Sequence, residues 1–269
     1  MLTNIVVAEP TGTTTHLELP LDHRIYSSRY EVREVEGLGP VKSNILLQNI
    51  ASMPGGKFQH AREDPRNIVL RLGFAPWSSD GQTVAELRRE LTRVFTPGRQ
   101  LQLRFESTHM ETVRIFGYVE THEPAIFSQD PEVVISILCP DPFFESYTNV
   151  STTLSSSNST VVYEGDVPVG FSVEYRPTVS LSRVSLTKSL ESMIYNGTVP
   201  ASGYLNINTR RGAKQVFSSA SGGARWLAPG SVWMELTPGN NTFSTTTTPS
   251  TTWSQRTIII RHRPLYAGV

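Results

Sequence analysis

The feature that most constrains this fold is the alternation of apolar and polar side chains in short runs between turns. In residues 100–105, Gln-Leu-Gln-Leu-Arg-Phe, every second side chain is apolar. A strand with one buried face requires this period of two. The pattern predicts strands at residues 30–35, 66–72, 100–105 and 113–119. Residues 133–138 are apolar on both faces, which predicts a strand in the centre of a sheet.

One segment, residues 83–95, has a helical period instead. Its apolar side chains recur every three or four residues, and the charged ones fall on the opposite face. Thr83 and Glu86 have the spacing of a capping box, and Pro97 with Gly98 would end the helix. We therefore expect one amphipathic helix docked on the sheet. Its buried face would consist of Val84, Leu87, Leu91 and Val94 or Phe95.

The second half of the chain has no useful helical period and consists of short strand-like runs separated by turn signals. We expect a β-sandwich or jelly roll there. Glycine and asparagine mark turns at Arg211-Gly212 and at residues 238–241. Residues 245–252, rich in Thr, Ser and Pro, are expected to form an exposed loop. The predicted strands are residues 169–175, 204–209, 214–217, 232–236 and 257–261.

A chain of 269 residues favours two domains over one. Residues 139–144, Cys-Pro-Asp-Pro-Phe-Phe, contain two prolines followed by an aromatic pair. Residues 148–160 are rich in Ser, Thr and Asn. We place the boundary between them. The fold class is therefore mainly β, with a sandwich-like domain at residues 1–145 that contains the helix, and a second β-sandwich at residues 146–269.

Charge and composition exclude several partners. Lys plus Arg and Asp plus Glu both total 24, so the chain lacks the positive field expected when nucleic acid is the main partner. No run approaches the roughly 20 apolar residues that a membrane-inserted helix needs. A single cysteine, Cys139, excludes a disulfide framework or multi-cysteine zinc site. Residues 1–9 resemble no secretory leader, so we expect synthesis and folding in the cytoplasm.

The sequence contains no motif that indicates catalysis. It has no nucleophile elbow, phosphate loop, dinucleotide fingerprint or His-Glu-x-x-His motif, and its six histidines are scattered. Four carboxylates could form an acid pair for glycoside cleavage, but solvated charges are the simpler interpretation. We therefore predict no catalytic, cofactor-binding or metal-binding residue, and no enzyme activity. The carboxylates are Glu106, Glu111, Glu120 and Glu123.

Three of the four tryptophans fall in the second half, where an exposed ring could stack on a sugar. Trp233 lies in an alternating run and is expected in the core, and Trp226, between glycine-rich turns, on a loop. A core or interface role is the simpler interpretation for these residues, which also include Trp253 and Tyr204. The basic clusters at Arg210-Arg211 and residues 261–263 are interpreted as a solvated turn and a protected edge strand.

The order of features resembles a known family. The series comprises Gly37-Leu38, Gly55-Gly56, the run after Arg66, the capped helix, residues 115–120 and finally Ile-Ser-Ile-Leu-Cys-Pro-Asp-Pro-Phe-Phe at residues 135–144. It resembles the amino-terminal domain of the distal tail proteins (Dit) of long-tailed siphophages. The second half resembles the family's galectin-like sandwich, through residues 165–170, 207–209, 233–240 and 266–269.

The resemblance implies a structural virion protein at the tail tip or baseplate hub. Its first domain would form a homohexameric ring between the tail tube protein and the tail-associated hub protein. The sandwich would act as an outer scaffold, and the Ser/Thr-rich residues 152–160 and 244–252 would be mobile or would become ordered on assembly.

Three alternatives stay open. A tail tube subunit would also be β-rich with one helix. A carbohydrate-binding module for host-surface glycans predicts an exposed aromatic pair on one sandwich face, where a scaffold predicts a polar face. A glycoside hydrolase needs two facing carboxylates in a cleft.

Overall fold

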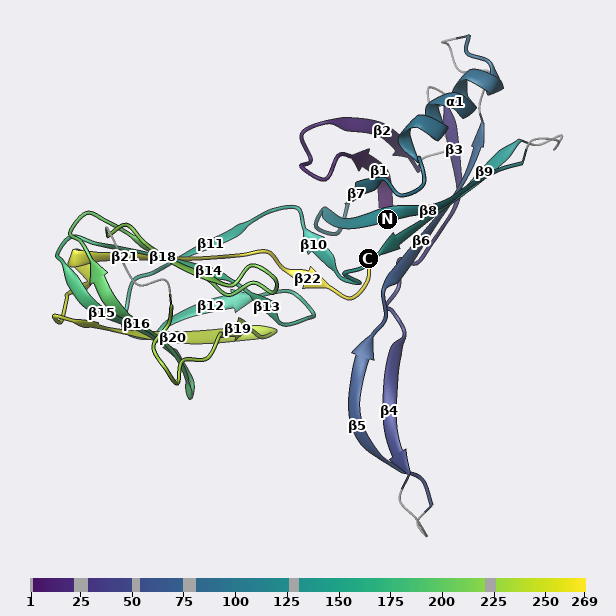
Figure 1. Cartoon of the computed structure of the whole chain (residues 1–269). Coiled ribbons are helices and arrows are strands. Elements are labelled where there is room, and N and C mark those ends of the chain that lie inside the picture. The colour runs from purple at the N-terminus through teal and green to yellow at the C-terminus, as the bar shows by residue number, and fades with distance from the viewer. Residues whose placement is uncertain (1, 22–28, 50–53, 75–80, 126–130, 221–225) are drawn as a thin grey trace. The chain divides into compact units, whose positions relative to one another are not determined.

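The computed structural model describes residues 2–21, 29–49, 54–74, 81–125, 131–220 and 226–269. The chain divides into two compact units, Met1–Tyr147 with Tyr266–Val269, and Thr148–Leu265. Both consist almost entirely of strands, which confirms the mainly β fold class (Figure 1). The four C-terminal residues, expected in the second domain, belong to the first unit.

The first unit is built on one nine-stranded sheet with antiparallel pairing. Its strand order is β2-β1-β7-β8-β9-β6-β3, while β10 pairs with β8 and β22 pairs with β10. A separate hairpin consists of β4 and β5. The strands are β1 (Leu2–Ala8), β2 (Thr15–Pro20), β3 (Tyr30–Glu36), β4 (Ser43–Asn49), β5 (Gly56–Glu63), β6 (Arg66–Phe74), β7 (Gln100–Ser107), β8 (Val113–Pro124), β9 (Glu132–Cys139), β10 (Phe144–Ser146) and β22 (Leu265–Tyr266).

The five strands predicted in the first half are all present, as β3, β6, β7, β8 and β9. The interior position predicted for residues 133–138 is confirmed, because β9 lies between β8 and β6. Only one of its faces is fully buried, however. Val133, Ile135 and Ile137 lie in the core, whereas Leu138 is 38% exposed. Strands β1 and β2 were not predicted from the sequence.

Helix α1 (Val84–Val94) confirms the predicted amphipathic segment. Leu87 and Leu91 are fully buried in the core of the first unit. The capping box is complete: Thr83 Oγ1 accepts a hydrogen bond from Glu86 N–H (3.3 Å), and Thr83 N–H donates to Glu86 Oε2 (2.8 Å). These two bonds satisfy donors that the first turn would otherwise leave unpaired.

Replacing Thr83 by alanine should lower the free energy of unfolding by about 1 kcal/mol, because the capping hydroxyl is lost. Urea denaturation would measure the change. Thr92→Ala is the matched control. Thr92 lies in the same helix and is exposed, and its hydroxyl donates only to the Arg88 carbonyl within the helix (2.9 Å). That variant should be neutral or slightly stabilising, and an equal loss in both variants would contradict the capping role.

A buried arginine connects four segments of the first unit. Arg66 is 1% exposed, and its guanidinium donates to the carbonyls of Pro142 and Gly39 (both 2.6 Å) and of Gly37. It also donates to the Ala267 carbonyl (2.6 Å) and lies 4.4 Å from the centre of the Phe144 ring. The C-terminal residues are therefore held in the first unit by this side chain.

The second unit contains two principal sheets around one core. The five-stranded sheet has the order β11-β21-β14-β17-β18, the four-stranded sheet has the order β12-β20-β15-β16, and β13 pairs with β19. Val173 and Tyr175 from the first sheet and Tyr195 and Phe243 from the second are buried in the same cluster, as in a β-sandwich. The strands are β11 (Val150–Leu154), β12 (Ser159–Tyr163), β13 (Val169–Gly170), β14 (Ser172–Pro177), β15 (Leu181–Lys188), β16 (Glu191–Val199), β17 (Leu205–Asn208), β18 (Gln215–Ser218), β19 (Glu235–Leu236), β20 (Gly239–Thr248) and β21 (Arg256–His262), with a 3₁₀ turn, η1 (Trp253–Gln255).

Both Ser/Thr-rich segments lie partly in strands, so the expectation that they are mobile or loop-like is wrong for residues 152–154, 159–160 and 244–248, whereas residues 155–158 and 249–252 lie outside strands. Residues 245–248 continue β20, which pairs with β15 on one side and β12 on the other. Thr245 is 7% exposed because it follows Phe243 on the inward face. Threonine's preference for strands prevails here because residues 245–248 pair with residues 183–186 of β15, whereas β12 pairs only with residues 239–243 of β20. The predicted turn at residues 238–241 also overlaps β20, and of the predicted strand 232–236 only β19 forms.

The basic segment at residues 261–263 was predicted as a protected edge strand, which is wrong for its first two residues. They end β21, which lies between β11 and β14. His262 is 1% exposed and stacks edge-on against Tyr163, with ring centroids 5.5 Å apart. By contrast, Arg211-Gly212 forms the predicted turn between β17 and β18, where Gly212 adopts φ +76°.

Acidification should destabilise the second unit through His262. Neither ring nitrogen has a hydrogen-bond partner among the described residues, and burial, reinforced by the positive charge of Arg210, lowers the pKa of His262 below 6.5. The folded state therefore favours neutral histidine, while the unfolded chain binds a proton near pH 6.5. This contribution to stability is complete above pH 6.5 and is lost as the pH falls toward the lowered pKa.

Thermal unfolding at pH 7.5 and pH 5.0 would measure this effect. The melting temperature of the wild-type second unit should fall on acidification, and the fall should be smaller in His262→Leu, which has no proton to bind at this position. The same fall in both proteins would contradict the assignment to His262.

Candidate assembly surface

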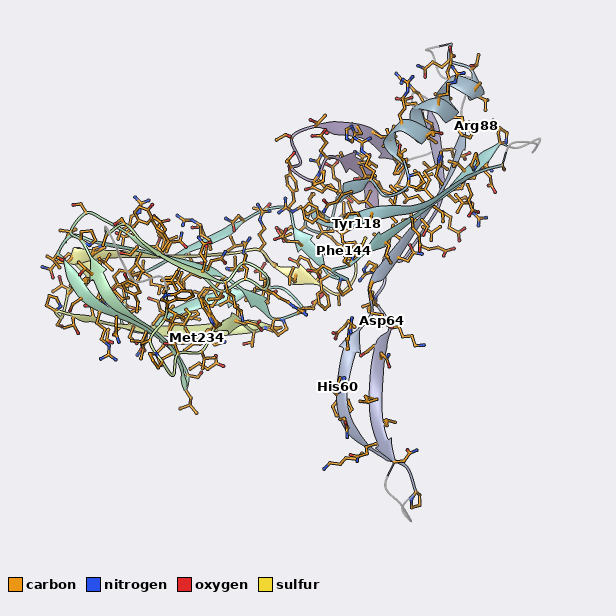
Figure 2. All side chains as sticks on the ribbon, in the orientation of Figure 1. His60, Asp64, Arg88, Tyr118, Phe144 and Met234 are labelled. Atoms are coloured by element: carbon orange, nitrogen blue, oxygen red, sulfur yellow. The ribbon has the colours of Figure 1, made fainter. Side chains whose placement is uncertain are left out.

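The hairpin of β4 and β5 differs from the rest of the first unit in its exposure. Among the described strands, the two pair only with each other (Figure 1). Every residue of both strands is exposed except the half-buried Ser43. At the base, Asp64 N–H donates to the Lys42 carbonyl (3.3 Å), and Figure 2 labels Asp64 here and His60 on β5. A two-stranded hairpin without a covering layer is only marginally stable in water.

One face of this hairpin is apolar. Ile45 lies opposite Ala61, and Leu47 lies opposite Phe58, so these four side chains share one face across a bulge. Ile45, Leu47 and Phe58 are 57%, 55% and 59% exposed. We call these four residues the hairpin apolar face.

The opposite face of the hairpin is mixed. Leu46, which is 48% exposed, lies opposite His60. Its neighbours on the same face of β4, two positions away on either side, are polar. Asn44 pairs with Arg62, and Gln48 pairs with Lys57. The hairpin is therefore amphipathic, although no described residue of the first unit covers either side. An exposed apolar face of this kind is typical of a surface that a protein partner covers.

The sequence signal for this surface was present but ambiguous. The consecutive run Ile45-Leu46-Leu47 does not alternate, so it indicates neither which face is apolar nor whether a second layer covers it. The register with β5 decides the first question, because a shift of one residue would move Ile45 and Leu47 to the other side.

Three of the four carboxylates considered for acid chemistry make separate local interactions, and the fourth, Glu123, is exposed. Glu106 pairs with Arg104 (2.8 Å), and Glu120 accepts a hydrogen bond from Ser136 (2.9 Å). Glu111 accepts from the hydroxyls of Ser146 (2.5 Å) and Tyr266 (2.8 Å). These contacts occupy the three carboxylates with structural partners.

The histidines do not assemble into a metal site in the part of the chain that the structure describes, where no group of three or more His, Cys, Asp or Glu side chains could hold a metal ion. His16 lies beside Arg99 (2.7 Å), and His122 and His262 are in separate units. His23 lies outside the described residues. Cys139 is buried, and burial raises the pKa of its thiol to about 12, which disfavours the reactive thiolate.

The aromatic candidates have different environments. Trp226 is 80% exposed, in agreement with the predicted loop, while Trp233 packs against the core without being fully buried. Trp253 packs against the same core, with the Arg256 guanidinium 4.1 Å from its ring centre. Tyr204 is 40% exposed and stacks on Phe217, a residue that the sequence analysis did not single out.

Comparison with known proteins gives similarity at the level of structure. No protein-family model and no curated protein sequence matches the chain. The crystal structure of the Dit protein of phage SPP1, titled a paradigm of the hub adsorption apparatus in phages infecting Gram-positive bacteria, superposes with a TM-score of 0.68. The alignment covers 96% of this chain and 98% of the SPP1 chain, at 15% identity. The chain has the fold of a phage Dit protein.

A chain of the phage P2 baseplate, in its activated conformation with Ca, is also similar, at 9% identity and a TM-score of 0.48. The alignment covers 97% of this chain and 98% of the P2 chain. No described helix is both long and apolar enough to span a membrane.

Within this Dit fold, the hairpin apolar face offers what an assembly contact needs. It presents large apolar side chains that no described part of the first unit covers, and its strands carry backbone groups that can pair with a further strand. Its chemistry is burial of apolar surface, with no group placed for bond making or breaking.

Proposed function

We propose that this chain is a structural component of the tail tip or baseplate of a long-tailed phage. In this proposal it is a distal tail protein, located in the virion, that joins the tail tube to the tail-associated hub protein and has no enzymatic role. Support comes from the superposition on the SPP1 Dit protein over nearly the whole of both chains. That protein's title describes a hub of an adsorption apparatus.

The single observation that carries an assembly role is the hairpin apolar face. Burial of apolar area contributes about 25 cal/mol per Å², so three large exposed side chains on one small hairpin favour a covered state. We infer that a neighbouring copy covers them in a closed ring of six first units. In such a ring each copy presents two different patches, one of which is the hairpin.

Immunogold electron microscopy with antibody against this chain tests the location in phage particles. Label confined to the far end of the tail is the expected result. Label along the shaft would instead make the chain a tail tube subunit, and the absence of label from all particles would overturn the tail assignment.

The ring is tested separately with the purified protein. Sedimentation equilibrium should give a mass near six times the 29.9 kDa of one chain, and electron microscopy should show closed rings. If the protein stays monomeric at all concentrations, including in the presence of the tail tube protein, the homohexamer is contradicted. The location in the tail is then still tested by the labelling experiment alone.

A further inference from the structure

The outer face of the five-stranded sheet carries an exposed aromatic pair at its β17–β18 edge. Tyr204 and Phe217 are 40% and 43% exposed. Their ring centroids lie 5.6 Å apart with 27° between the ring planes. Phe217 lies opposite Asn206, and Ser219 N–H donates to the Tyr204 carbonyl (2.9 Å), so the two rings are diagonal neighbours on one face.

Polar side chains occupy the same outer face of the sheet, from the rings at the edge strand β18 toward β14 in the middle of the sheet. Asn206 lies between Phe217 on β18 and Glu174 on β14. Asn208 lies between Gln215 on β18 and Ser172 on β14. The alternating residues of these strands are buried in the core, so the amide side chains point away from it.

A fixed ion-pair cluster borders the amides. Glu174 Oε2 accepts a hydrogen bond from Arg261 (2.5 Å), and Glu174 Oε1 accepts one from Arg176. Glu174 is itself only 8% exposed. A guanidinium carries five N–H donors, so Arg261, whose side chain is 32% exposed, retains the capacity to donate outward as well.

We propose that this face binds one or two pyranose rings of a neutral glycan. The outer face of the aromatic pair would stack on the C–H face of the sugar, because aromatic rings provide apolar surface of matching shape. Asn206 supplies a donor and an acceptor, which suits hydroxyl groups. Asn208, whose Oδ1 accepts a hydrogen bond from the Arg210 N–H (3.1 Å), supplies its amide donors, and Arg261 supplies a further donor.

The chemistry of this face differs from that of the hairpin apolar face. The hairpin apolar face consists of contiguous aliphatic and aromatic groups, whereas here two rings adjoin amides and three charged side chains. The inference goes beyond the proposed tail function and does not depend on it, since it concerns the second unit alone.

A purely structural explanation is that the aromatic pair stabilises an edge hairpin. The test must therefore measure sugar contact as well as folding. Saturation-transfer NMR suits the whole protein in any oligomeric state. The probes are maltohexaose, cellohexaose, galactohexaose and N-acetylglucosamine hexamer, each added separately to the full chain.

At least one probe should show transfer to its ring C–H protons. Phe217→Leu and Tyr204→Leu should weaken binding at least about tenfold while the melting temperature confirms folding. Asn206→Ala with Asn208→Ala should also weaken it without altering the rings. The control is Trp226→Leu, because Trp226 is the more exposed aromatic of the same unit, and it should bind as the wild type does.

Three results would overturn the proposal. The first is no transfer to any of the four probes from the wild type. The second is unchanged binding in all variants of the aromatic pair and the amides. The third is protection of Tyr204 and Phe217 from hydroxyl-radical labelling when the protein assembles with itself, since this would make the face a contact between copies.

Discussion

Replacing Arg66 by methionine is expected to lower the free energy of unfolding of the first unit by about 3–5 kcal/mol. The guanidinium donates to four backbone carbonyls, of Gly37, Gly39, Pro142 and Ala267. Methionine fills similar space without donating, and each buried carbonyl left without a donor costs about 1–3 kcal/mol where water cannot replace it. Native-state hydrogen exchange of the backbone amides in the first unit would measure the loss.

The charge of Arg66 is balanced by these dipoles and not by an adjacent anion. Its neighbour Cys139 stays neutral because burial raises the pKa of the thiol to about 12. Arg66→Lys should therefore restore only part of the stability, since a point-like ammonium with three donors cannot reproduce the planar fork.

Arg71→Met is the matched control for Arg66→Met. Arg71 lies on the same strand, but its side chain is 44% exposed and pairs with Glu34 at 3.5 Å. An exposed pair of this kind contributes about 0–1 kcal/mol. Equal effects of the two substitutions, or wild-type stability in Arg66→Met, would show that the buried hydrogen bonds do not hold the four segments together.

Replacing both Leu47 and Phe58 by lysine is expected to weaken self-association at least about 100-fold. The two residues face each other on the hairpin apolar face, and a covered lysine there would lose its hydration without gaining a partner. The melting temperature should change little when both proteins are compared at a concentration where each is a monomer, because both side chains are already exposed in the single chain. Sedimentation velocity over a range of concentrations would measure the association.

Leu46→Lys is the control for this pair. Leu46 lies on the same strand and is 48% exposed, but it points to the opposite face, beside His60. It should leave association nearly unchanged. If Leu46→Lys disrupts the assembly as strongly as the double substitution does, the apolar face is not the contact surface.

Local patterns were sufficient to predict the elements whose signals lie within one segment. The helix cap needs only Thr83 and Glu86, three residues apart, and both of its hydrogen bonds form. The alternation in residues 100–105 likewise predicts β7, and the interior position of β9 follows from its apolar run. Such signals are readable because side chains three or two positions apart share a face.

Other features required partners that are distant in the sequence. Residues 245–248 have the composition of a loop, yet they form part of β20 because they pair with residues 183–186 of β15, a strand much earlier in the chain. Phe217 becomes notable only because Tyr204 lies diagonally across from it. The apolar side of the β4–β5 hairpin depends on the register between its strands.

The sequence by itself determined that this chain is mainly β, with an amphipathic helix capped at Thr83. Only the tertiary structure decided which surfaces are covered and where Arg66 finds its acceptors, which come from residues 27 to 201 positions away. The physical reason is that periodicity is a local property of the backbone. Burial, strand pairing and the satisfaction of a buried charge depend on contacts that form only when distant segments meet.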